Sequence, residues 1–197
     1  MYRPDIKPHK SIRLKGYDYS RAGAYFVTIC THNKECLFGS VMDENMVLND
    51  FGRMVDVEWL KTAEIRKNVV LDGYVIMPNH FHGIVLITEN NSGKARLATT
   101  HGNVQIKMEF GKPQSGSLSV IVGSFKSAVA RQINLMRNTP GKEVWQCNYY
   151  EHIIRNPDEL NRIREYIINN PLKWYPDRDN PNGIPDESDL KFWEDFS

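Results

Sequence analysis

Two histidines separated by one residue are the feature of this sequence with the clearest chemical potential. They lie in the segment Met77-Pro78-Asn79-His80-Phe81-His82-Gly83-Ile84-Val85-Leu86, which has apolar, β-rich residues on both sides. Successive side chains of a strand point to opposite faces, so His80 and His82 point the same way, with Cα atoms roughly 6.5 Å apart. Two neutral imidazoles placed like this could hold one metal ion. Because such pairs also occur as structural histidines, a third ligand is needed.

A predicted helix over residues 157–170 could supply that ligand. Asn156 suits the N-cap, Pro157 the first helical position, and Pro171 would end the helix. At 3.6 residues per turn, Tyr166 and Asn170 lie one turn apart on the edge of its apolar stripe. The helix would therefore present a phenol, a candidate nucleophile, beside an amide oxygen, a candidate metal ligand. The alternative is a boundary tyrosine that packs its ring on the core.

Four segments, taken together, resemble one protein family. His80-Phe81-His82 resembles the HUH motif (His, bulky apolar residue, His) of the single-tyrosine HUH endonucleases. The segments 123–129, 145–156 and 164–171 resemble the REP-associated tyrosine transposases, which are relatives of the small insertion-sequence transposases. The similarity covers most of residues 15–176. The HUH motif alone is short, but the ordered set of four segments is specific.

The resemblance implies a role for each matching residue. His80 and His82 match the metal ligands and Tyr166 matches the catalytic tyrosine. Asn170 matches the polar residue that completes the metal site, where transposon relatives often carry glutamine. The family cuts single-stranded DNA at the foot of imperfect palindromic hairpins, leaving a 5′-phosphotyrosine and a free 3′-hydroxyl. The resemblance thus implies a metal-dependent endonuclease and strand transferase, acting as a monomer or a homodimer.

The donor types also indicate the cofactor. A site built from imidazole and amide oxygen, without thiolate, suits Mg²⁺ or Mn²⁺. Such a cation would neutralise charge that builds on the phosphate oxygens during phosphodiester cleavage. A general base is harder to assign: His152 could serve as the base or contact DNA, and Glu151 and Glu165 are alternatives.

Contacts with DNA must be local, because 25 Lys and Arg residues face 24 Asp and Glu residues and the formal net charge is only +1. Lys126 and Arg131 occur in a predicted helix over residues 118–136, and Arg155, Arg162 and Arg164 occur near the proposed nucleophile. These five residues are the candidate DNA contacts. Three aromatic residues could stack on unpaired bases or pack in the core, namely Trp145, Tyr149 and Tyr150.

The order of predicted elements favours one α+β domain over residues 1–197. We expect strands at 24–31, 69–77, 80–88 and 148–155, a hairpin near 35–49, and helices at 50–65, 118–136 and 157–170. HUH relatives have a ferredoxin-like antiparallel sheet, so we expect this sheet with helices packed mainly on one face. A basic N-terminal arm (about 1–20), a flexible loop (about 90–117) and an irregular C-terminal tail (about 176–197) complete the expected domain.

The remaining composition is that of an ordinary globular protein. Three cysteines without paired spacing argue against both a disulfide framework and a zinc site. No segment has membrane-spanning length and no leader is evident, so we expect a cytoplasmic protein. Two other functions stay open. One is a hairpin-binding protein without catalysis, and the other is a metal hydrolase that acts on a small molecule with water as nucleophile.

Overall fold

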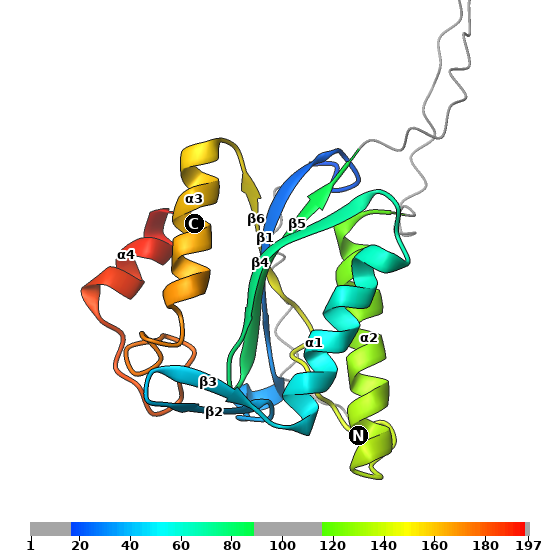
Figure 1. The fold of residues 1–197 in the computed structure, drawn as a ribbon, viewed down its shortest axis with the longest axis vertical. Helices are drawn as coiled ribbons and strands as arrows, with labels where there is room; N and C mark the ends of the chain where they lie inside the picture. Colours follow the sequence, from blue (N-terminus) through cyan, green and yellow to red (C-terminus); the bar gives the residue numbers. More distant parts are fainter. Residues whose placement is uncertain (1–16, 89–115, 196–197) are drawn as a thin grey trace, which may run out of the picture.

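The fold is built on one four-stranded antiparallel sheet (Figure 1). The structure is a computed structural model that describes residues 17–88 and 116–195. The strands follow one another across the sheet in the order β4-β5-β1-β6, with bounds Val69–Ile76, His80–Ile87, Gly23–Cys30 and Tyr150–Ile154. Most of the predicted basic arm (about 1–20) and most of the predicted loop at 90–117 lie outside the described residues.

Two helices cover one face of the sheet and complete a ferredoxin-like core. Helix α1 (Asp50–Glu64) connects the hairpin β2 (Gly39–Met42) and β3 (Asn45–Leu48) to β4, and α2 (Leu118–Met136) precedes β6. Along the chain, α1 separates β1 from β4, and α2 separates β5 from β6. Neither pair is adjacent in the sheet, whose two central strands are β5 and β1. The predicted α+β class and antiparallel sheet are confirmed.

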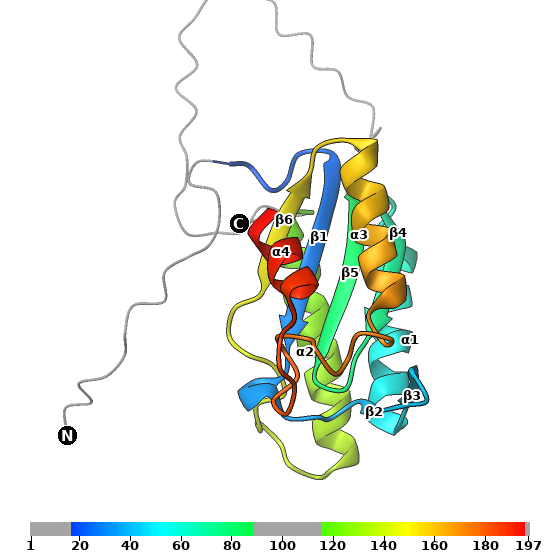
Figure 2. The same cartoon turned by 90° about the vertical axis from the view of Figure 1, so that its left-hand side faces the viewer.

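The other face is covered as well, which differs from the expected one-sided packing. Helices α3 (Pro157–Asn169) and α4 (Glu187–Asp195) lie against it, as Figure 2 shows. The strands carry apolar side chains on both faces of the sheet, so both faces need helices to cover them. On β1, for example, Tyr25 and Val27 face α1 and α2, whereas Phe26 packs with Ile163 and Ile167 of α3.

The residues that predicted the start of α3 have the expected places in the structure. The Asn156 side chain accepts a hydrogen bond from the backbone N–H of Glu159 at 2.8 Å, and Pro157 occupies the first helical position. The helix is attached to the edge strand β4 by a two-bond ion pair between Arg164 and Asp72, with nitrogen–oxygen distances of 2.9 and 2.6 Å.

Two short elements go beyond the prediction. A 3-10 turn, η1, spans His32–Lys34. The C-terminal tail, expected to be irregular, contains α4, which forms because Phe192 and Trp193 dock on the apolar face of the sheet beside Phe26. Among the described helices, none combines the length and apolar character needed to cross a membrane.

Gly83 lets the back of the histidine strand pack closely. A Cβ atom built at this position would lie 2.7 Å from the Phe81 ring and 2.8 Å from the Trp59 ring. Both rings are fully buried, so neither has space to withdraw. Glycine at this position is therefore a packing requirement of the strand that carries His82.

We expect Gly83→Ala to lower the free energy of unfolding by about 1–3 kcal/mol, the usual effect of overpacking a core. Gly123→Ala is the matched control, since a Cβ there meets no atom within 4 Å, and alanine in place of an exposed helical glycine should add up to about 1 kcal/mol. Urea denaturation of both variants measures the difference. Equal stabilities would contradict the packing argument.

Candidate metal centre and nucleophile

The two histidines lie on the face of the sheet covered by α3 and α4. Phe81 between them points to the opposite face and packs with Trp59 at a ring distance of 4.6 Å. Strand alternation then requires both imidazoles to point toward α3. Their rings are 4.6 Å apart and neither is exposed to solvent.

His82 is oriented by the neighbouring strand. Thr28 on β1 lies opposite His82 in the register, and its Oγ1 is 2.8 Å from His82 Nδ1. This bond leaves Nε2 as the ring nitrogen available to a ligand. Burial lowers the pKa of His82 well below its usual value. The imidazole is therefore neutral at pH 7, which is the form that binds metal.

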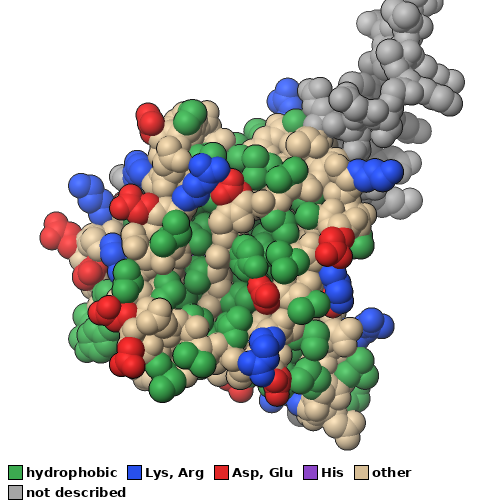
Figure 3. All heavy atoms as spheres, in the orientation of Figure 1, with side chains coloured by type: hydrophobic (Ala, Val, Ile, Leu, Met, Phe, Trp, Pro, Cys, Tyr) green, Lys and Arg blue, Asp and Glu red, His purple; other side chains and the backbone are tan. Residues whose placement is uncertain are grey.

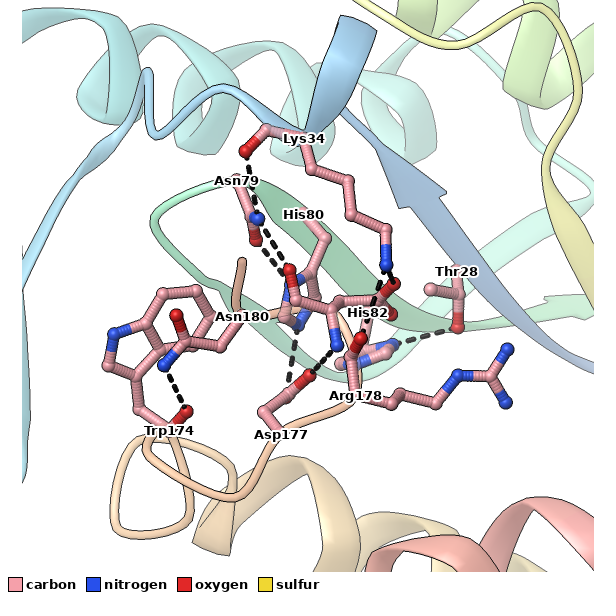
Figure 4. Close-up of polar contacts among 10 residues, drawn as sticks. Thr28, Lys34, Asn79, His80, His82, Trp174, Asp177, Arg178 and Asn180 are labelled. Carbon is pink, nitrogen blue, oxygen red and sulfur yellow. Dashed lines mark hydrogen bonds and ion pairs between the residues drawn. The ribbon is translucent and has the colours of Figure 1, made fainter. Parts of the chain in front are cut away.

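His80 is oriented by the residue before it. The Asn79 side chain is buried, and its Oδ1 is 2.9 Å from His80 Nδ1. The amide nitrogen of Asn79 donates to the carbonyls of Lys34 at 3.1 Å and Asp179 at 2.7 Å. One amide thus fixes His80 and connects three segments of the chain around it (Figure 4).

Asp177 is a candidate ligand that the sequence reasoning missed. Ligand atoms of His80, His82 and Asp177 all lie within 4.8 Å of one another. Asp177 Oδ2 is 3.6 Å from His80 Nε2, and its side chain is only 2% exposed. Burial raises the pKa of Asp177, while His80 and a hydrogen bond with Asn170 oppose that shift. The signal available in the sequence was an acid a few residues after the tyrosine helix.

The donor set fits a divalent cation. Four buried atoms around this point have no hydrogen-bond partner among the described residues: His80 Nε2, His82 Nε2, Asp177 Oδ2 and Asn170 Oδ1. Buried polar atoms are rarely left without partners in a protein interior. Two imidazoles, a carboxylate and an amide oxygen are together suitable ligands for Mg²⁺ or Mn²⁺. The predicted amide ligand, Asn170, lies at the end of α3 beside Asp177.

Tyr166 of α3 lies next to this group. Its ring centroid is 5.3 Å from that of His82, in a near-perpendicular arrangement. The opposite contact is with α4, where Phe192 stacks on the Tyr166 ring at 3.7 Å with an interplanar angle of 8°. The predicted proximity of the late helix to the histidine strand is thus found within a single chain.

Helix α4 and the segment 174–180 close the site from outside. Trp193 lies 6.0 Å from the His82 ring, and the Arg178 guanidinium lies 4.3 Å above the Trp193 ring. Because the imidazoles are not exposed, a molecule from solution can reach them only if α4 or this segment moves. The site is therefore in a closed arrangement.

One protein of known sequence matches nearly the whole chain. An uncharacterized protein of Haemophilus influenzae is 42% identical over 177 residues, which cover 90% of this chain and 96% of that protein. The chain belongs to the same family as this protein. No protein-family model matches the chain.

Solved structures identify the fold. The structure of a REP-associated tyrosine transposase bound to a REP hairpin matches 82% of this chain and 74% of its own, with a TM-score of 0.54 and 20% identity. The chain has the fold of a REP-associated tyrosine transposase. A second match, a candidate transposase of Deinococcus radiodurans, covers 80% of this chain and 95% of its own at 15% identity, and its TM-score of 0.41 is too low to support an argument.

The candidate DNA contacts of this transposase-like fold occupy different places. Arg162 lines a cavity of about 200 Å³ beside Tyr166, together with Lys173. Arg155 is exposed at the start of α3. Arg164 is bound to Asp72, which lowers the pKa of that carboxyl group. Arg131 lies on α2, on the other side of the sheet.

Lys126, a predicted DNA contact, is bound to the backbone of a neighbouring segment. Its ammonium group donates to the carbonyls of Gln146 at 2.7 Å and Cys147 at 3.0 Å. Contact with DNA would require these bonds to break, so we assign Lys126 to the support of this segment. Trp145 is also structural, because its buried ring packs against Phe38 at 5.1 Å. Of the three candidate stacking residues, Tyr149 and Tyr150 line a surface pocket.

His152 lies on the same face as His82 but is engaged elsewhere. Its Nε2 is 2.8 Å from Glu159 Oε1, and Glu159 also accepts a hydrogen bond from the Arg155 backbone. This network joins β6 to the first turn of α3. A role for His152 as general base stays a prediction.

Charged side chains of both signs are interspersed over the face shown in Figure 3, in agreement with the balanced composition.

Removal of the Thr28 hydroxyl tests the orientation of His82. We expect Thr28→Val to weaken Mn²⁺ binding about 10–100-fold, the usual effect of losing a hydrogen bond behind a ligating histidine. Isothermal titration calorimetry measures the affinity. Thr62→Val is the matched control, since Thr62 is also buried but bonds the Glu58 carbonyl of its own helix. Equal affinities for the two variants would show that Thr28 does not support the metal centre.

Proposed function

We propose that this protein is a metal-dependent endonuclease and strand transferase that cuts single-stranded DNA near hairpins through a 5′-phosphotyrosine intermediate. One observation carries the proposal: the ring centroid of Tyr166 lies 5.3 Å from that of His82, and His82 belongs to a buried group of two histidines and an aspartate. A phenol next to a cation site supplies both a nucleophile and charge stabilisation, which are the two requirements of phosphodiester cleavage.

The proposed reaction uses one nucleophile. Tyr166 Oη attacks the phosphorus, a bond forms between them, and the bond from phosphorus to the 3′-oxygen breaks. The tyrosine proton is lost during attack, and the leaving oxygen ends as a free 3′-hydroxyl. Because the phosphotyrosine ester retains the energy of the broken bond, a second 3′-hydroxyl can reverse the reaction and join two strands. Cutting and joining therefore need no separate energy source.

His80, His82 and Asp177 would hold the cation, with Asn170 as a further oxygen ligand. When bound, Mg²⁺ or Mn²⁺ would act as a Lewis acid on the non-bridging phosphate oxygens. The protein's own contribution is to orient the two imidazoles through Thr28 and Asn79 and to keep His82 neutral through burial, which lowers its pKa. Preorganised ligands of this kind need no rearrangement when charge develops.

The DNA partner is proposed from the structural relative, which was solved with a REP hairpin. A hairpin has a paired stem and unpaired flanks, and only the unpaired part can enter a closed site next to a tyrosine. The cavity beside Tyr166 carries Arg162 and Lys173, which suit the phosphates of such a flank.

Covalent capture tests the nucleophile. We expect the wild-type protein, incubated with tailed hairpin DNA and Mn²⁺, to give a protein–DNA adduct on a denaturing gel. The adduct should be absent with Tyr166→Phe or EDTA and present with the control Tyr175→Phe, because Tyr175 is 68% exposed and outside the site. Cleavage that persists in Tyr166→Phe would assign the attack to water, and binding without cleavage by the wild type would indicate a binding protein.

A charge-removal pair tests the path of the DNA. We expect Arg162→Ala to weaken binding of single-stranded DNA for all sequences and to reduce the slope of log affinity against log salt by about 0.7, the value for one phosphate contact. Arg131→Ala is the matched control on the far side of the sheet. Fluorescence anisotropy at several salt concentrations measures both. A larger change for Arg131→Ala would place the DNA on the α2 side.

A further inference from the structure

A pocket of about 380 Å³ opens on the sheet next to the candidate metal centre. Its floor includes Thr28, the residue that orients His82, and Tyr150, which lies opposite Thr28 on the next strand. His82, Thr28 and Tyr150 therefore form one row across β5, β1 and β6. Arg178 and Asp179, which follow the candidate ligand Asp177, form another wall. A group in this pocket would be close to a phosphate held at the metal centre.

The lining suits an uncharged flat group better than a phosphate. Both cations in the lining already have partners: Lys34 is paired with Asp179, with a nitrogen–oxygen distance of 3.1 Å, and the Arg178 guanidinium lies 4.3 Å over the Trp193 ring. The other walls present the aromatic rings of Tyr149 and Tyr150 and the side-chain amides of Gln146 and Asn148. Aromatic rings stack on nucleobases of any type, whereas amides form paired hydrogen bonds with the edge of a particular base.

The amide wall is held in place from behind. Lys126 of α2 donates to the carbonyls of Gln146, Cys147 and Asn148, at 2.7, 3.0 and 3.5 Å. The Gln146 backbone N–H also donates to the Cys30 carbonyl of β1 at 2.9 Å. Three consecutive carbonyls bound to one ammonium group leave this segment little freedom, so its two amide side chains project from a fixed backbone. Preorganisation of this kind favours selective recognition.

The amides also stand beside a second cavity of about 380 Å³, which Gln146, Asn148 and Lys34 share with the turn at His32 and Asn33. In this turn Asn33 and Lys34 have φ of 54° and 55°, in the left-handed region. Such conformations are costly for residues with side chains and are often retained at functional sites. Because the two cavities share Gln146 and Asn148, an unpaired DNA strand could run from one cavity into the other along the protein surface.

We propose that this pocket binds one unpaired nucleobase next to the scissile phosphate, with Tyr150 as a stacking surface and Gln146 and Asn148 as readers of the base edge. The inference rests on the proposed function for its ligand, single-stranded DNA. It adds a site of sequence selection that is separate from the nucleophile and the metal ligands. Lys126 is then a positioning residue, since it acts through the backbone of the two readers.

Binding selection tests the proposal without requiring cleavage. A pool of hairpins with randomised unpaired tails is equilibrated with the full chain carrying Tyr166→Phe, and the bound fraction is sequenced. We expect one tail position to show a base preference. Adding Asn148→Ala or Gln146→Ala should reduce the preference at that position about tenfold and leave the other positions unchanged. Asn182→Ala is the matched control, as an exposed asparagine that does not line the pocket.

The outcomes separate this proposal from the proposed function. A preference that survives both amide substitutions, an equal loss of binding at every position, or no preference in the parent would each overturn the pocket assignment. Lys126→Met provides a second variant in which both amides are intact, and it should weaken the base preference at the same tail position. Thermal melting reports whether this variant is folded. If the wild type forms the protein–DNA adduct but no base preference depends on Gln146 or Asn148, only the pocket assignment is refuted. If a base preference depends on these amides but no adduct forms, only the proposed nuclease activity is refuted.

Discussion

The candidate site depends on how one strand divides its side chains between two faces. Phe81 and Val85 of β5 belong to the core beneath α1 and α2, so His80 and His82 must point to the other side. A shift of one residue in the register with β1 would exchange the faces, burying the imidazoles in the apolar core beneath α1 and α2 and placing Phe81 beneath α3. Gly83 allows the core side to pack closely. The tight packing behind the strand is thus what holds the histidines in register with Thr28.

Burial then determines what the histidines can do. Two imidazoles and a carboxylate are removed from water, and each loses solvation that must be replaced. Thr28 and Asn79 satisfy the Nδ1 atoms, while both Nε2 atoms and one Asp177 oxygen converge on the same point. With a cation bound, all three atoms would have a partner at once, whereas a contact between His80 and Asp177 alone leaves His82 Nε2 without one. The arrangement therefore favours a metal ion over a simple ion pair.

Local signals in the sequence were sufficient for the strands of the main sheet, for helices α1 to α3 and for the histidine pair. The cap at Asn156, the proline at 157 and the alternation around Phe81 each act within a few residues, and the structure follows them. Long-range contacts were not predictable in this way. Asp177 reaches His80 through a turn with no periodicity, Arg164 is bound to an acid 92 residues away, and Lys126 turns toward backbone carbonyls that a sequence does not display. The charge of a residue indicated that it needs a partner but not which partner it has.

The same burial limits access to Tyr166, the proposed nucleophile. Tyr166 lies between His82 and Phe192, so the stacking that seats α4 occupies the side from which a strand would approach. A helix of nine residues has little stability of its own and depends on the contacts of Phe192 and Trp193. Those contacts are between aromatic rings, and unpaired bases stack on aromatic rings in the same way, so in the proposed function the bases of the DNA would take the place of Phe192 and Trp193. A buried metal centre is compatible with the proposed attack by Tyr166 only because the cover is this short and its contacts can be exchanged for contacts with the DNA.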